Sequence, residues 1–185
     1  MSARRQPKAV LCVLVGTAGM LALAFGAIDA GAPAKKRHQH GAHVHGAAKL
    51  NIAVEDRAAT VELESPAESI VGFEHKATTA ADQQKQAKAL DLLQHQIGSM
   101  VLFEPALGCR WSPTNLEVVQ HDQEHSEVHG AFAVTCDGPL AGSRIRFAFT
   151  KAFPAIRTVS VQVVAATQQV GATIQQDRGV VEVPR

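Results

Sequence analysis

Aromatic side chains and net charge are both scarce in this 185-residue chain. It has no tyrosine, one tryptophan and seven phenylalanines, and its formal net charge is +1. Proteins that bind single-stranded nucleic acids need stacking aromatics and a strongly basic surface. We therefore expect no nucleic acid among the partners. The chain also lacks a Gly-rich phosphate loop, a Gly-x-Ser-x-Gly nucleophile turn and a His-Glu-x-x-His helix, so we expect that it is not an enzyme.

Cysteine is rare as well, with three residues in the chain. Cys12 lies within an N-terminal apolar run, and the remaining two are Cys109 and Cys136. An even pair in an exported protein predicts a disulfide bond, with two buried free thiols as the alternative. An oxidised sulfur cannot act as a thiolate ligand, so we do not expect these cysteines to bind a metal.

The N-terminus has the order of a secretory signal peptide. Arg4, Arg5 and Lys8 precede an apolar run over about residues 9–27, and small residues follow it. We expect a cleavable signal peptide at 1–30, export to the periplasm of a Gram-negative bacterium, and no stable membrane insertion after cleavage. The run is short for a spanning helix of about 20 residues, and a retained anchor is the alternative.

Beyond the leader, the pattern predicts a flexible His-rich segment at 31–47 and one α+β domain at 48–185. Residues 49–54 and 60–64 alternate polar and apolar residues around a polar turn, as in a β-hairpin. Five or six short strand-like runs follow further on, and together they predict an antiparallel sheet. We expect these runs at 106–111, 116–119, 127–136, 145–149, 158–164 and 180–183.

One main helix is expected between the hairpin and the later strands. Thr79 and Asp82 have the spacing of a capping box, and Gly98 is a plausible stop. The apolar residues at helical spacing, which we expect to face the core, are Ala87, Leu90, Leu93 and Ile97.

Histidines are the abundant chemical feature, and four of the nine lie within eight residues. They are His38, His40, His43 and His45. In an extended His-x-His segment both rings lie on one side, about 6–7 Å apart at the Cα atoms. Imidazole suits zinc, copper and nickel, so this segment is expected to capture a metal ion. The alternative is a solvated tail with weak affinity.

A second group lies on the expected strand 127–136. The even-numbered residues of this segment are apolar, so they should face the core: Val128, Phe132, Val134 and Cys136. His125, Glu127 and His129 would then project together from the other face, as metal ligands in type and spacing. The alternative is a polar strand face with solvated histidines. His75 follows a compact apolar turn, and His121 is either a ligand or a loop residue.

Four separated segments resemble the ZrgA family of zinc uptake proteins. They are residues 43–53, 62–67, 71–75 and 125–136, and the similarity spans roughly residues 39–165. The resemblance implies a periplasmic zinc-binding protein that assists zinc acquisition, with a zinc transporter as a possible partner. Unlike family members with a long His- and acid-rich insert, this chain has only residues 121–125 at that place.

We therefore hypothesise one folded zinc site and an auxiliary N-terminal collector. In this hypothesis His75, His125 and His129 form the folded site, with Glu74 or Glu127 as oxygen ligands. His75 is included because it lies in a segment similar to the family. Three alternatives stay open: a copper- or nickel-handling protein, an envelope structural or interaction module that binds metal incidentally, and a zinc hydrolase with Glu127 as its base.

Overall fold

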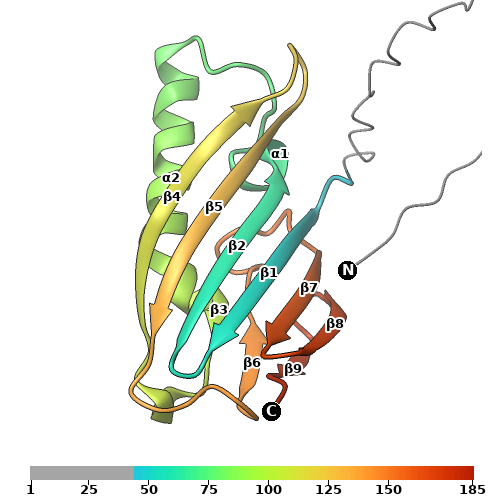
Figure 1. Cartoon of the computed structure of the whole chain (residues 1–185). Coiled ribbons are helices and arrows are strands. Elements are labelled where there is room, and N and C mark those ends of the chain that lie inside the picture. Colours follow the sequence, from blue (N-terminus) through green and yellow to red (C-terminus); the bar gives the residue numbers. More distant parts are fainter. Residues whose placement is uncertain (1–43) are drawn as a thin grey trace, which may run out of the picture. The chain divides into compact units, whose positions relative to one another are not determined.

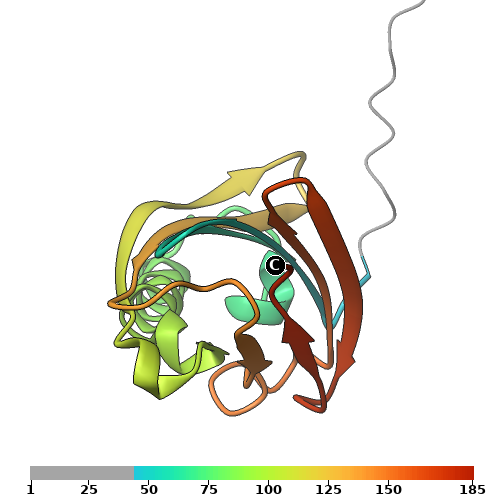
Figure 2. The same cartoon turned by 60° about the horizontal axis from the view of Figure 1, so that its bottom comes forward.

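The computed structural model describes residues 44–185. The expected signal peptide, most of the His-rich segment, and His38, His40 and His43 lie outside the described residues. A six-stranded sheet in the order β4-β5-β2-β1-β7-β8 forms one wall of the domain (Figure 1). A three-stranded sheet, β3-β6-β9, lies across from it, and Figure 2 shows the larger sheet curving around helix α2. The α+β class predicted from the sequence is confirmed.

The first hairpin forms where alternation predicts it. Strands β1 (Ala47–Glu55) and β2 (Ala58–Pro66) pair in antiparallel fashion, and β2 also pairs with β5 (Ser126–Thr135). On its other side β1 pairs in parallel with β7 (Thr158–Ala165), so the sheet is mixed rather than purely antiparallel. Strand β8 (Gln168–Gln175), which the apolar pattern does not predict, completes this edge by pairing with β7.

Helix α2 (Ala80–Met100) begins at the predicted cap, where Thr79 Oγ1 accepts a hydrogen bond from the Asp82 amide at 3.1 Å. Only its C-terminal half enters the core, through Leu93, Ile97 and Met100. The prediction that Ala87 faces the core is therefore wrong, because Ala87 is exposed on the earlier half of the helix.

Gly98 does not end the helix, contrary to the sequence-based prediction. The helix continues to Met100, and a Cβ atom at position 98 would lie 2.7 Å from the indole ring of Trp111. The glycine is needed for this close approach of β4 (Arg110–Gln120) to the helix, rather than as a stop.

The expected strand at 106–111 is also largely wrong. Its first part is a short 3₁₀ helix, η1 (Pro105–Leu107), and Gly108 then adopts a left-handed conformation before β4 begins at Arg110. Pro105 favours the helical turn because its fixed φ suits a helix start.

The remaining elements are short. Helix α1 (Ala67–Ile70) follows β2 directly, and the small sheet consists of β3 (Val101–Leu102), β6 (Arg144–Phe147) and β9 (Val180–Glu182). The core between the layers holds buried side chains that include Phe132, Phe149 and Leu140. Within residues 44–185, no helix combines the length and the hydrophobicity needed to cross a membrane.

A disulfide joins Cys109 to Cys136, as predicted from the sequence. Cys109 precedes β4 and Cys136 follows β5, so the bond closes the end of this strand pair where Arg110 lies opposite Thr135. The other end of the same pair carries the histidines.

Candidate metal centre

Two groups of histidine and carboxylate side chains lie close enough to hold a metal ion in the described part of the chain. We call them the β4–β5 cluster (His121, Glu127 and His129) and the His45 cluster (His45, Glu68 and Glu74).

The β4–β5 cluster follows from the register of two paired strands. Val119 lies opposite Glu127 and Gln120 lies opposite Ser126, so His121 continues β4 on the Glu127 face. His129 shares this face because it is two residues further along β5. The opposite face is in the core, where Val128 and Phe132 are fully buried, as the alternating pattern predicts.

One carboxylate oxygen lies between the two imidazoles. Glu127 Oε2 is 2.9 Å from His121 Nε2 and 3.0 Å from His129 Nε2. Two ligand atoms bound to one tetrahedral zinc ion, each about 2.1 Å from it, lie about 3.4 Å apart. The three side chains are partly buried, with exposed fractions of 19, 25 and 35%. An ion would thus require only small side-chain movements and would remain reachable from solvent.

The turn between the strands holds His125 away from this cluster. Asp122 Oδ1 accepts hydrogen bonds from the amides of Glu124 and His125, both at 2.8 Å, and the His125 ring lies 2.9 Å from the same carboxylate. The amide of Glu124 and then the His125 ring lower the pKa of Asp122 below its ordinary value. In return the Asp122 hydrogen bond, followed by its charge, raises the pKa of His125.

The letters His-x-x-Glu-His at residues 121–125 also match a zinc-peptidase motif that the sequence reading missed. That spacing brings two imidazoles together only on a helix, where residues i and i+4 share a face. Here the segment is a turn, in which His121 approaches Glu127 and His125 approaches Asp122. The geometry therefore does not bring the two histidines of this motif to one metal ion.

His75 lies beside the start of α2, outside both clusters. Its ring stacks on Phe73 with centroids 4.5 Å apart, and its Nε2 is 3.5 Å from Asp82 Oδ2. Asp82 is fixed by the Thr79 hydroxyl, which is the main cause of its lowered pKa, with a smaller effect from His75.

The His45 cluster joins the start of the described chain to α1 and the loop after it. His45 Nδ1 lies 2.6 Å from Glu68 Oε2, and its Nε2 lies 3.6 Å from Glu74 Oε1. His45 and Glu74 were both named from the sequence, but Glu68 was not. An exposed glutamate on a four-residue helix gives no signal in the sequence.

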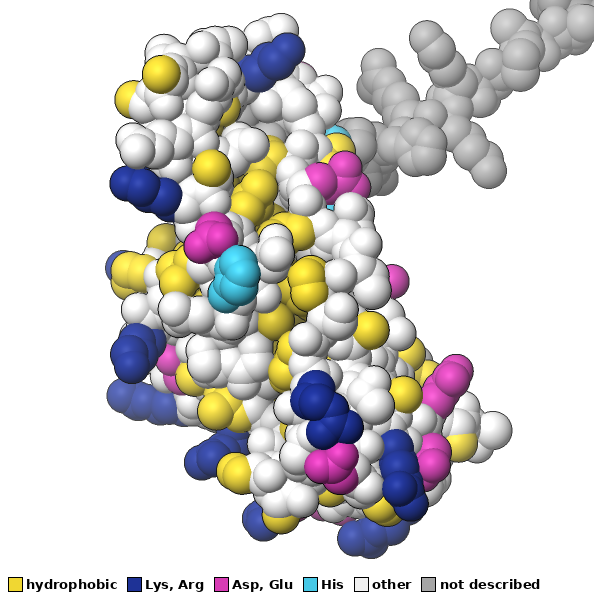
Figure 3. Space-filling model, turned by 90° about the vertical axis from the view of Figure 1, so that its left-hand side faces the viewer, with side chains coloured by type: hydrophobic (Ala, Val, Ile, Leu, Met, Phe, Trp, Pro, Cys, Tyr) yellow, Lys and Arg dark blue, Asp and Glu magenta, His cyan; other side chains and the backbone are white. Residues whose placement is uncertain are grey.

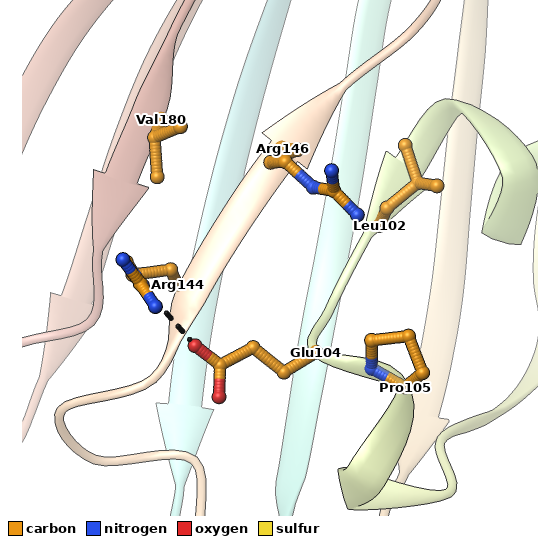
Figure 4. A pocket seen from close by; sticks show the side chains of 6 residues that line it. All are labelled: Leu102, Glu104, Pro105, Arg144, Arg146 and Val180. Carbon is orange, nitrogen blue, oxygen red and sulfur yellow. Dashed lines mark hydrogen bonds and ion pairs between the residues drawn. The ribbon is translucent and has the colours of Figure 1, made fainter.

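Two surface hollows offer no comparable ligand set. One, of about 360 Å³, lies on the small sheet, where Arg144 forms an ion pair of 3.3 Å with Glu104 and the Arg146 side chain points toward Leu102 (Figure 4). The other, of about 610 Å³, lies between α2 and β4, and its lining includes one histidine, His95, and no carboxylate. Figure 3 views this side of the molecule, where hydrophobic, basic and acidic side chains are interspersed.

An α+β domain with two imidazole–carboxylate groups defines a candidate metal-handling protein. A family model described as ZrgA family zinc uptake protein matches residues 42–183. The chain therefore belongs to the ZrgA family of zinc uptake proteins, and the resemblance inferred from its motifs is confirmed. The match extends to the C-terminal strands, beyond the segments that carried that resemblance. A comparison with curated proteins finds no match.

Proposed function

We propose that this protein binds zinc in the periplasm and assists zinc acquisition, with the β4–β5 cluster as the folded binding site. The observation that carries the proposal is the Glu127 carboxylate oxygen placed between two imidazole nitrogens at 2.9 and 3.0 Å. Compared with the ligand set expected from the sequence, the proposal retains Glu127 and His129 and adds His121. It leaves His75 and His125 outside the site.

Three protein ligands suit a transported ion. Structural zinc sites are closed by four protein ligands, whereas a three-ligand site leaves one position for water or for a donor from another molecule. A partner protein can then bind the ion before the first ligands release it. The expected partner is a zinc transport system.

The surroundings of the site also favour a cation. Glu124 and Asp122 lie in the adjoining turn, and Glu117 lies opposite His129 on β4. Clustered carboxylates raise the local concentration of cations and speed their capture. We assign His38, His40 and His43 the role of auxiliary collectors that supply ions to the β4–β5 cluster.

Zinc is preferred over copper or nickel because of the family, since the ligand types suit all three metals. The periplasmic location is supported by the signal-peptide pattern and by the disulfide, which persists in oxidising compartments.

A zinc titration of the full chain and a His121→Ala/His129→Ala variant tests the folded site. Loss of a residue that merely supports a ligand costs 10–100-fold in metal affinity, so loss of two direct ligands should cost more than about 100-fold. His95→Ala is the matched control, because His95 is an exposed histidine on α2 bonded to Asp91. Because histidines outside the cluster remain, the variant should lose one binding event from the titration curve, and a curve identical to that of the wild type would refute the assignment.

A further inference from the structure

We propose that the His45 cluster is a second metal site, separate from the β4–β5 cluster and richer in carboxylate. It would take a divalent transition-metal ion such as zinc through one imidazole and two carboxylates. The two clusters share no residue, so this inference does not depend on the β4–β5 cluster being the folded site of the proposed function.

The backbone around His45 is fixed before any ion binds. The Gly46 amide donates a hydrogen bond to Ser69 Oγ at 3.0 Å, and the Gly46 carbonyl accepts from the amides of Arg157 and Thr158. Gly46 has a φ of +76°, and a Cβ atom there would lie 3.0 Å from the Ala155 carbonyl oxygen. His45 is therefore held beside α1, which carries Glu68.

The backbone of Glu74 is fixed independently. Its carbonyl oxygen accepts hydrogen bonds from Ser126 Oγ at 2.7 Å and from Gln120 Nε2 at 3.0 Å. These bonds tie the loop after α1 to the ends of β4 and β5. The side chain of Glu74 is thus directed toward His45 by contacts that do not involve its carboxylate.

The Glu74 carboxylate is the observation that points to a ligand. Its side chain is only 9% exposed, and Oε1 is buried without a hydrogen-bond partner among the described residues. His45 Nε2, at 3.6 Å, is too distant for a hydrogen bond and forms an ion pair with this oxygen only when the ring is protonated. Buried carboxylates are paired, hydrogen-bonded or bound to metals, because desolvation of an unpaired charge is costly. A cation between Glu74 and His45 satisfies this oxygen.

The remaining geometry suits a single ion. One ligand atom from each of His45, Glu68 and Glu74 lies within 4.8 Å of the other two. Ligands of a tetrahedral zinc ion are about 3.4 Å apart, so the set must contract slightly. His45 and Glu68 are exposed and can move, while Glu74 provides the fixed position. Bound metal would attach the start of the domain to α1, immediately after the His-rich segment.

The direct test is the ring ¹⁵N shifts of the histidines as zinc is added to the full chain. The His45 signals are assigned with a His45→Ala variant. We expect the His45 ring to shift in the wild-type chain and in the His121→Ala/His129→Ala variant. In a Glu74→Gln variant we expect the His45 shift to require at least about 10-fold more zinc than in the wild type.

Two further variants control for folding and for surface charge. Glu68→Gln removes an exposed ligand without disturbing the core, and it should also weaken the His45 response. Glu64→Gln removes an exposed carboxylate that pairs with Lys49 at 3.1 Å, and it should leave the response unchanged. If the ring ¹⁵N signals of His121 and His129 shift on addition of zinc and those of His45 do not, the second site alone is overturned. The converse result would overturn the folded site of the proposed function and support this one.

Discussion

Reduction of the Cys109–Cys136 disulfide should destabilise the domain strongly. The two cysteines are 27 residues apart in sequence. The chain-entropy relation gives a loss of about 3.5 kcal/mol in the free energy of unfolding for a loop of this length, because the unfolded chain regains its freedom. A domain of this size is typically stable by about 5–15 kcal/mol, so the reduced protein should still fold.

Urea unfolding with and without a phosphine reductant measures this loss. With a urea dependence of about 1–3 kcal/mol per molar, the midpoint should fall by roughly 1–3.5 M, and the slope should rise because the unfolded chain without its crosslink exposes more surface. A shift below about 0.3 M would refute the reasoning. It would show that the unfolded chain is restrained by something other than the disulfide.

The same bond should have no effect on zinc affinity in the folded state. Glu127 and Cys136 lie at opposite ends of β5, about 30 Å apart at roughly 3.4 Å per residue. A Cys109→Ala/Cys136→Ala chain, titrated where it is fully folded, should bind zinc with the wild-type dissociation constant. Weaker binding in that folded chain would show that strain at the disulfide end reaches the cluster.

Three further predictions concern pH and packing. Zinc affinity should fall as the pH drops, by up to about two log units per pH unit, because each of the two ligand imidazoles must be neutral to bind the ion. Titrations at several pH values measure this, and a flat profile would exclude histidine ligation. The hydrogen bond from Arg110 lowers the pKa of Asp137, so this pair stabilises the fold at neutral pH. The stabilisation is lost as the pH falls from 3.8, the ordinary pKa of this carboxyl group, through the lowered pKa of the folded state. A carboxyl NMR titration should show the Asp137 pKa rising in an Arg110→Gln variant. Gly98→Ala should lower the free energy of unfolding by about 1–3 kcal/mol, although alanine favours helices, because the added methyl meets Trp111 at 2.7 Å. The exposed Ser99→Ala is its control, and equal urea midpoints for the two variants would contradict the packing argument.

The sequence predicts the elements whose two faces differ in polarity. In β5 the alternation separates buried Val128 and Phe132 from Glu127 and His129, and the strand and half of the β4–β5 cluster follow from it. Strand β8 could not be predicted from such an alternation. It is an edge strand with one buried residue, Ile174, and so it has little apolar pattern to detect.

The residue of the β4–β5 cluster that the sequence analysis left open as a ligand or a loop residue, His121, can be placed only from the pairing register of two strands, not from the pattern within one strand. His121 reaches Glu127 because Val119 pairs with Glu127, and pairing between strands depends on long-range contacts. A hairpin built from the runs before and after residues 121–125 would have placed His121 on the correct face. The position of His125 depends on the Asp122 carboxylate, which competes with any metal for the ring.

The parallel pairing of β1 with β7 has a consequence for the order of folding. Ala47, near the start of the described chain, lies opposite Thr158, so the middle of the large sheet is assembled from segments far apart in sequence. Such non-local contacts slow folding, because a long loop must close before they form. Strand β1 lacks its neighbour on one side until the chain has been made as far as β7 (Thr158–Ala165). A chain of this design therefore closes its core only once the segment that forms β7 is available to pair with β1.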